Sequence, residues 1–264
     1  MEVNFGNVAK NYAKYRNDIP DELLRSLRTR EVDFFEKKVV DLGAGTGALT
    51  RILSKKGADV IGVEPSQELI EEAKTIDRTQ GVSIEYVNGY SESTNLNSNF
   101  YDTVTVMRAW HWFNRPETLD EVKRILKDKG KLLVMDSGFI ANSKVVVDTI
   151  QLIKSHMPDG EVKSAGSKGT AKQLINSFPV EWFQEWKEHS FDMRDTYKFE
   201  YQVPFTNEEW CGRVGSLSWL SSFSEEKRKQ VLDDVYQYVR KEFGDVIHQI
   251  EHGCYVTILQ LTKD

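Results

Sequence analysis

Short apolar segments alternate with amphipathic segments along the first half of the chain. Five apolar segments have the length and the flanking turns of buried strands. They are Val39–Leu42, Asp59–Val63, Ser83–Val87, Tyr101–Met107 and Lys131–Met135. Between them, apolar residues recur at helical spacing in Ala48–Lys56, Gln67–Ala73 and Glu117–Leu126. This alternation predicts an α/β fold with a mostly parallel sheet and right-handed crossovers.

The pattern changes after residue 138. A helical stretch leads into the Gly-, Ser- and Lys-rich loop GEVKSAGSKG and then into an aromatic cluster at Phe178–Trp186. The remaining predicted elements are the helices Asn7–Tyr15, Pro20–Arg30, Asn207–Leu220 and Glu225–Phe243 and the strands Phe191–Val203 and Cys254–Leu261. Together with the five earlier segments, the sequence predicts seven strands.

The composition is that of an ordinary globular protein. Of 264 residues, 39% are hydrophobic and 29% are charged, and this length suits either one α/β domain with an insertion or two domains. No apolar run reaches the length of a membrane span, and the N-terminus lacks the apolar core of a secretory signal. The net charge of −6 argues against a nucleic-acid partner, because binding phosphates requires concentrated Lys and Arg.

The two cysteines carry no pattern of their own. Cys211 and Cys254 lie far apart, and neither is flanked by residues at metal-ligand spacing. We therefore expect two thiols in a reducing cytoplasm, with no disulfide and no metal site. The expected protein is cytoplasmic, contacts no membrane, and is a monomer or a homodimer.

A glycine-rich turn follows the first strand. The order of strand, Gly43-Ala-Gly45-Thr-Gly47 and helix predicts a tight turn at the carboxyl end of a central strand, where open α/β sheets bind ligands. Because Gly43, Gly45 and Ala48 also satisfy the dinucleotide pattern G-x-G-x-x-G/A, the turn alone fits two cofactors. A purely structural turn is the third interpretation.

Two carboxylates near the turn distinguish these interpretations. Glu64 ends the second predicted strand, where a carboxylate accepts ribose hydroxyl hydrogen bonds in either kind of site. Asp41 immediately precedes the turn, and its charge would repel a pyrophosphate but attract the α-ammonium or the sulfonium of a methionine-derived cofactor. The helix N-terminus at Thr46–Ala48 is placed to meet that cofactor's carboxylate. Asp41 therefore favours the sulfonium cofactor over NAD.

Longer segments carry a family resemblance. The segment VVDLGAGTGALTRILSKKGADVIGVEPSQELIEEA resembles the first two motifs of class I S-adenosylmethionine-dependent methyltransferases. YDTVTVMRAWHWF and the opening FGNVAKNYAKYRNDIP resemble the type 11 subgroup that includes trans-aconitate methyltransferase. The resemblance covers residues 5–138 well. It implies S-adenosyl-L-methionine as cofactor and a small-molecule methyl acceptor.

The resemblance also implies a Rossmann-like fold. We expect a seven-stranded, mostly parallel sheet with an antiparallel C-terminal strand and a helical, aromatic insertion on the substrate side. A single methyltransferase domain would span residues 1–264, with lid helices in 1–35 and the cofactor-binding core in 36–138. The insertion would occupy 139–220, and 221–264 would complete the sheet.

The cofactor contacts are implied position by position. The glycine turn would line the methionine portion, Glu64 the ribose, and the residues after the second and third strands the adenine. Tyr12, Tyr15 and Arg16 match the lid. The full set is Tyr12, Tyr15, Arg16, Asp41, Gly43, Gly45, Thr46, Gly47, Glu64, Pro65, Ser66, Gly89, Tyr90, Ser91, Glu92 and Met107, with Asn88 beside Gly89.

Methyl transfer from a sulfonium is an in-line displacement in which alignment of the reactants supplies about 7–11 kcal/mol of the barrier. A base is needed only if the nucleophile carries a proton. The candidates for catalysis are His111 and Arg108, which follow the fourth strand. The alternative is that His111 packs between Trp110 and Trp112 in a structural cluster.

The substrate side has weaker signals. Arg108 and Arg213 would bind a carboxylate through paired hydrogen bonds, and the segment from Arg213 to Trp219 resembles an R-x-x-S-x-S stretch of the subgroup. The candidate substrate contacts are Trp110, His111, Arg213, Ser216 and Trp219. Structural arginines are the alternative, and Trp182, Trp186, Trp210 and Trp219 could instead form a small core of the insertion. An NAD-dependent oxidoreductase and a non-catalytic cofactor-binding protein are the other function classes.

Overall fold

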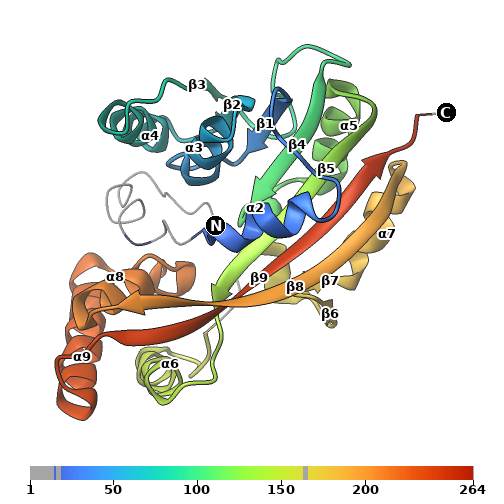
Figure 1. Cartoon of the computed structure of the whole chain (residues 1–264). Helices are drawn as coiled ribbons and strands as arrows, with labels where there is room; N and C mark the ends of the chain where they lie inside the picture. Colours follow the sequence, from blue (N-terminus) through green and yellow to red (C-terminus); the bar gives the residue numbers. More distant parts are fainter. Residues whose placement is uncertain (1–14, 16–18, 163–165, 264) are drawn as a thin grey trace.

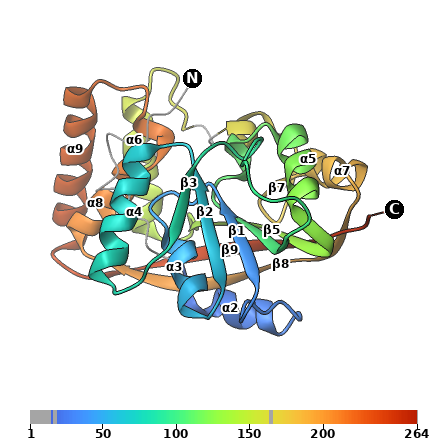
Figure 2. The same cartoon turned by 90° about the horizontal axis from the view of Figure 1, so that it is seen from above.

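The computed structural model describes residues 15, 19–162 and 166–263. A twisted sheet of seven strands in the order β3-β2-β1-β4-β5-β9-β8 crosses the molecule (Figures 1 and 2). Its strands are β1 (Lys38–Leu42), β2 (Asp59–Glu64), β3 (Glu85–Asn88), β4 (Tyr101–Met107), β5 (Leu126–Phe139), β8 (Phe191–Phe205) and β9 (His248–Leu261). The first five are parallel, and β9 is antiparallel to both of its neighbours. The predicted sheet, with its antiparallel C-terminal strand, is confirmed.

The helices connect these strands and cover both faces of the sheet. They are α2 (Asp21–Arg28), α3 (Ala48–Lys55), α4 (Gln67–Thr79), α5 (Arg115–Ile125), α6 (Lys144–His156), α7 (Val180–Glu188), α8 (Asn207–Gly215) and α9 (Glu225–Phe243). Single 3₁₀ turns are η2 (Trp110–Trp112), η3 (Gly166–Thr170) and η4 (Ser218–Leu220), and β6 (Leu174–Ile175) pairs with β7 (Phe178–Pro179). Of the predicted helix Asn7–Tyr15, only Tyr15 lies within the described residues.

The alternating side chains of β1 divide the core into two layers. Val39 belongs to the layer that packs against α2 and α3, where Leu23 and Leu53 are fully buried. Val40 belongs to the opposite layer, which packs against α5 and α7 through Leu119 and other buried residues. Because successive strand residues face opposite sides, this arrangement buries β1 on both faces. It holds the carboxyl ends of β1, β2 and β4 at one edge.

A third cluster lies where β8 and β9 extend beyond the other strands. There α6, α8 and α9 gather at one end of the sheet (Figure 1) and bury Trp210, Val214 and Val235. The indole Nε1 of Trp210 donates to Thr149 Oγ1 at 3.0 Å and joins α8 to α6. The range 139–220 therefore contains helices of this cluster together with β8, which is an edge strand of the main sheet. This cluster places α8 beside the sheet edge that holds the carboxyl ends of the parallel strands.

Three elements are much longer than the sequence predicted. Strand β5 spans Leu126–Phe139 in place of the predicted Lys131–Met135. Helix α4 continues past Ala73 to Thr79, and β9 begins at His248, not at Cys254. Among the described residues, no helix has the length and apolarity to cross a bilayer. The cytoplasmic location and the oligomeric state stay predictions.

Candidate functional site

The glycine turn joins β1 to α3 in a left-handed conformation. Gly43, Gly45 and Gly47 have φ angles of +67°, +57° and +75°, which side chains other than glycine rarely adopt. A Cβ on Gly43 would also lie 2.6 Å from the Cβ of Ala109, and one on Gly47 would overlap the hydroxyl of Tyr86. At these two positions glycine is required by backbone angle and by protein packing.

Glu64 stabilises the turn from the end of β2. Its Oε2 accepts a hydrogen bond from Gly45 N at 2.9 Å, and its Oε1 accepts one from Ser66 N at 3.0 Å. The side chain is buried, and this burial raises its pKa despite the two backbone hydrogen bonds. Each carboxylate oxygen retains a second lone pair, so Glu64 can still accept hydrogen bonds from a ligand. Pro65 lines the same cavity as Glu64, whereas Ser66 caps α4 by accepting from Leu69 N.

Asp41 is buried within the sheet. It is 2% exposed, and its two oxygens accept hydrogen bonds from Thr50 Oγ1 at 2.7 Å and Thr105 Oγ1 at 2.8 Å. Burial raises its pKa to about 6, against the effect of the two hydroxyls. Asp41 and Thr46 border a small cavity of about 30 Å³ behind the turn and do not line the main cavity. A direct contact with the cofactor stays a prediction.

The loop after β3 is turned away from the main cavity. Asn88 Nδ2 donates to Pro65 O at 2.9 Å, and the Ser91 hydroxyl is buried at 3.0 Å from Thr118 Oγ1. Tyr90 is 64% exposed, and Glu92 accepts from the backbone of Asn114. The predicted adenine contacts Gly89, Tyr90, Ser91 and Glu92 are therefore not among the cavity-lining residues. Asn88 thus contacts the residue that follows β2, Ser91 contacts α5, and the adenine role of this loop stays a prediction.

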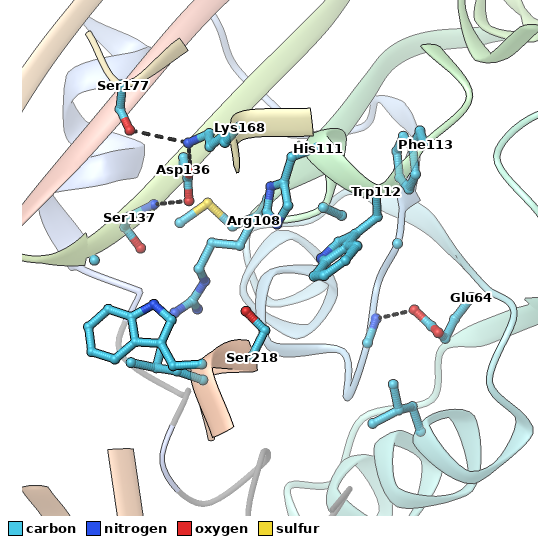
Figure 3. A pocket seen from close by; sticks show the side chains of 18 of the residues that line it. Glu64, Arg108, His111, Trp112, Phe113, Asp136, Ser137, Lys168, Ser177 and Ser218 are labelled. Carbon is cyan, nitrogen blue, oxygen red and sulfur yellow. Dashed lines mark hydrogen bonds and ion pairs between the residues drawn. The ribbon is translucent and has the colours of Figure 1, made fainter. Parts of the chain in front are cut away.

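A cavity of about 400 Å³ runs along the carboxyl ends of β1, β4 and β5 (Figure 3). On one side it is lined by the turn and the start of α4, namely Gly43, Gly45, Glu64, Pro65 and Leu69. On the other side it is lined by Asp136–Phe139 of β5, Lys168, Ser177, Arg213 and Leu217–Trp219. Residues from Met107 to Phe113 lie between the two sides, with Trp110 excepted. The cavity therefore has a side next to the glycine turn and a side next to the insertion.

Five of the predicted catalytic, substrate and β4 residues line this cavity: Met107, Arg108, His111, Arg213 and Trp219. Arg108 has a left-handed φ of +59°, which is rare for a residue with a side chain, and its N donates to Met135 O at 2.9 Å. This turn at the end of β4 directs the guanidinium into the cavity, as Figure 3 shows. Backbone conformations of this kind concentrate at functional sites.

Two predicted substrate contacts do not reach the cavity. Trp110 is 2% exposed and packs in the core with ring centroids 6.3 Å from Trp186 and 5.9 Å from Phe113. Ser216 is 6% exposed, and its hydroxyl donates to Arg213 O at 2.6 Å. Protein atoms cover both side chains, and direct substrate contact by Trp110 and Ser216 stays a prediction. The neighbouring Trp112 lines the cavity instead.

The structure leaves both interpretations of His111 open. Its ring packs 5.0 Å from that of Trp112, and it also lines the cavity. Its backbone oxygen accepts a hydrogen bond from Ser167 Oγ at 3.2 Å, which ties η2 to the insertion. Of the insertion tryptophans, Trp182, Trp186 and Trp210 are buried in the core.

Sequence reasoning missed the charged pair on the insertion side. The Lys168 ammonium forms an ion pair with Asp136 Oδ2 and donates to Ser177 Oγ at 3.2 Å (Figure 3). Burial alone would raise the pKa of Asp136, but Lys168, His111 and Arg108 hold that pKa below its ordinary value. Asp136 directly follows a predicted strand, so the rule that identified Glu64 could have found it. Lys168 lies in a polar loop and gave no signal.

Tyr15, near the N-terminus, contacts α8. A Cβ on Gly212 would overlap the ring of Tyr15, so the tyrosine occupies the space that a side chain would need. Tyr15 therefore packs against α8 at Gly212. The other two predicted lid residues, Tyr12 and Arg16, lie outside the described residues.

The thiols and potential metal ligands add no further site. Cys211 and Cys254 are both free and buried. In the part of the chain that the structure describes, no three His, Cys, Asp or Glu side chains are grouped as a metal ion would require. The chemistry of the cavity therefore depends on the side chains named above.

One protein family matches part of the chain. Residues 40–134, which run from β1 through most of β5, match the family described as a methyltransferase domain. The domain supplies the glycine turn, Glu64, Arg108 and His111, whereas Asp136 and Lys168 lie beyond its end.

Curated proteins that are similar in sequence to this chain are named as methyltransferases. A Dictyostelium discoideum protein named as a methyltransferase is 37% identical over 140 residues, which are 53% of this chain and 51% of that protein. The chain spans about half the length of the curated relatives that it matches first.

Solved structures share the fold. A protein described as a type II methyltransferase, from Anaeromyxobacter dehalogenans, has a TM-score of 0.62 at 16% identity and covers 92% of this chain and 96% of its own. Phosphoethanolamine N-methyltransferase 2 of Haemonchus contortus, solved with phosphomonomethylethanolamine and S-adenosylhomocysteine, has a TM-score of 0.55 at 13% identity. Its match covers 98% of this chain and 58% of that one.

Proposed function

We propose that this chain is an S-adenosylmethionine-dependent methyltransferase that methylates a small molecule bearing a carboxylate. The observation that carries the proposal is Glu64 at the cavity wall beside the glycine turn of a methyltransferase domain. Membership of the trans-aconitate-like subgroup stays a prediction.

The residues around the turn fit the cofactor S-adenosyl-L-methionine. Glu64 retains lone pairs for ribose hydroxyls, and Pro65 and Leu69 give an apolar surface next to it. The cofactor supplies a methyl group on a positively charged sulfur. Asp41 behind the turn favours positive charge there and disfavours the pyrophosphate of a dinucleotide, whereas Glu64 suits the ribose of either cofactor. The Haemonchus contortus enzyme was solved with the demethylated product of this cofactor.

The insertion side of the cavity favours an anionic acceptor. Its lining includes the cations Arg108, Lys168 and Arg213 and one carboxylate, Asp136. The excess of positive charge stabilises a carboxylate in a partly dehydrated site, where opposite charges attract more strongly than in water. Charge on the wall thus supports the carboxylate class.

Alignment is the main catalytic contribution that these side chains offer. Arg108 and Arg213 orient the acceptor against the turn side of the cavity, and Trp112 restricts water near it. If the nucleophile carries a proton, His111 is placed on the cavity wall to accept it at a ring nitrogen. An acceptor already deprotonated at neutral pH needs no such step.

Calorimetry and an acceptor screen test the proposal. S-adenosylhomocysteine is expected to bind the full chain with micromolar affinity, whereas NADH at the same concentration is not. Release of S-adenosylhomocysteine from S-adenosylmethionine should then be stimulated by members of a small carboxylic acid panel and not by their amides. Failure to bind S-adenosylhomocysteine at millimolar concentration contradicts the cofactor. Binding without turnover across the panel favours a non-catalytic cofactor-binding protein.

A further inference from the structure

The η3 segment of the insertion lies directly on the wall of the cavity. Gly166 has a φ of +54°, and a Cβ there would overlap the backbone oxygen of His111. Ser167 Oγ donates to the same oxygen at 3.2 Å. These two contacts fix η3 against η2. The next residue, Lys168, is thereby placed at the cavity (Figure 3).

The ammonium of Lys168 is held in position by two protein acceptors. The Lys168 side chain is 11% exposed, and its ammonium contacts Asp136 Oδ2 and Ser177 Oγ. Asp136 Oδ1 accepts from the backbone N of Ser137 at 2.8 Å, so both oxygens of the carboxylate have protein partners. An ammonium has three protons, and Asp136 and Ser177 account for two of them. Replacing a buried ion pair by apolar residues is often neutral or stabilising, so stability alone does not explain this pair on a cavity wall.

Ser137 provides an independent indication of a ligand. It is 7% exposed and lines the cavity, yet its hydroxyl has no hydrogen-bond partner among the residues that the structure describes. A buried hydroxyl without a partner is unfavourable, and such groups are rare in folded proteins. Ser137 and Lys168 both line this cavity, on the side formed by β5 and the insertion.

We propose that Lys168 and Ser137 form the subsite that binds the acceptor's carboxylate and thereby determine acceptor specificity. Lys168 donates its third N–H and Ser137 its O–H to the carboxylate oxygens, and Asp136 is the residue that positions Lys168. The proposal rests on the proposed methyltransferase function and identifies its acceptor class more closely. Phe139 and Trp219, whose rings lie 5.8 Å apart, line the cavity on the same side. The acceptor is therefore an acid with an apolar, ring-sized body.

Phenylacetate tests this subsite, with phenylacetamide as its uncharged counterpart. Calorimetry is carried out on the full chain saturated with S-adenosylhomocysteine. The wild type is expected to bind phenylacetate at least tenfold more tightly than phenylacetamide. Lys168→Met should weaken phenylacetate binding at least tenfold and remove the preference, and Ser137→Ala should weaken it severalfold. Lys172→Met, which alters an exposed lysine of the same insertion away from the cavity, should leave the affinity unchanged.

A second variant separates a loss of ligand binding from a loss of protein stability. Lys168→Met leaves Asp136 as an unpaired buried charge, so the double variant K168M/D136N is measured in parallel with melting temperatures. It should also lose the preference for phenylacetate. Equal phenylacetate affinity in the double variant and the wild type overturns the proposal, and so does a wild type that does not distinguish acid from amide. Failure of the proposed function is separate, because it appears as a wild type that does not bind S-adenosylhomocysteine, and the titrations can then be repeated without it.

Discussion

At the scale of single residues, Glu64 links the glycine turn, α4 and the expected ribose position. Glu64→Ala should raise the dissociation constant of S-adenosylhomocysteine about 10- to 100-fold, because charge-assisted hydrogen bonds worth about 1.5–3 kcal/mol each are lost. Glu68→Ala, an exposed carboxylate on the first turn of the same helix, is the matched control. Calorimetry measures both. An unchanged constant for Glu64→Ala would place the ribose site elsewhere.

Asp41 gives a prediction that depends on pH. Its pKa is raised from 3.8 to about 6, so the folded chain holds this proton more tightly than the unfolded chain does. The stability that this group contributes is therefore present below about pH 4 and is lost as the pH rises through 6. The wild type therefore loses this stability between pH 4 and pH 8, whereas Asp41→Asn does not. The free energy of unfolding of Asp41→Asn minus that of the wild type should rise by about 2–3 kcal/mol from pH 4 to pH 8.

Urea denaturation of the ligand-free protein at the two pH values measures this change. The same variant should bind S-adenosylmethionine more weakly at pH 8, because the negative charge behind the turn is removed. Thr50→Val, which removes one hydroxyl that hydrogen-bonds the carboxylate, is the control for packing. A pH-independent difference between Asp41→Asn and the wild type would show that Asp41 is not protonated in this range.

Sequence alone identified the residues whose position depends on local rules. Glu64 and Arg108 follow the ends of predicted parallel strands, and such ends meet at one sheet edge. The burial of Trp110 could not be read from the sequence, because the turn after β4 decides whether a side chain faces the core or the cavity. Lys168 could not be found, since its place depends on how η3 packs on His111, far away in sequence.

At the scale of elements, Glu121 links α5 to the loop after β3 through hydrogen bonds. It accepts hydrogen bonds from the backbone N and the hydroxyl of Thr94 and from Arg124. Burial would raise its pKa, but these hydrogen bonds lower it to about 2. The stabilisation is thus present above about pH 4.5 and is lost as the pH falls through 2.

Glu121→Gln should therefore destabilise the protein by about 2 kcal/mol at pH 7 and by much less at pH 3. Denaturant unfolding at both pH values is the measurement. Glu117→Gln, an exposed residue one turn earlier on α5, should change stability little at either pH. Equal destabilisation at pH 7 and pH 3 would assign the effect to packing and not to charge.

Element types were predictable from periodicity, but several element lengths were not. Helix α4 continues past Ala73 because Asp77 faces inward and pairs with Arg51 at 2.9 Å, so a polar residue occupies a core-facing position. Strand β9 starts at His248, where buried histidines alternate with polar residues and conceal the apolar pattern. Hydrophobic periodicity misses an element wherever burial is satisfied by ion pairs or hydrogen bonds.

At the scale of the whole molecule, the sheet extends beyond the matched methyltransferase domain. The domain match ends at residue 134, yet β5 pairs with β9 from Lys131 to Phe139, and β8 covers the other edge of β9. A chain that ends at residue 190 would leave β5 as an open apolar edge. We expect it to be aggregated on size-exclusion chromatography, in contrast to the full chain. A monodisperse truncated protein that binds S-adenosylhomocysteine would contradict this.

A single substitution on β9 tests the contribution of this strand to stability without truncating the chain. Leu259 is fully buried on β9, and Leu259→Ala should cost about 2–5 kcal/mol of unfolding free energy. Gln260→Ala, at the next position of the strand, should cost much less. Denaturant unfolding of both variants gives the comparison.

The division of the cavity has a consequence for how such a protein changes over time. Residues 43–69 line one side, whereas residues 136–219 supply most of the other. Mutations in the later stretch can alter what is methylated while the earlier stretch continues to hold the methyl donor. A lineage can therefore acquire new substrates by exchanging the segment around Lys168, without passing through a form that has lost its cofactor.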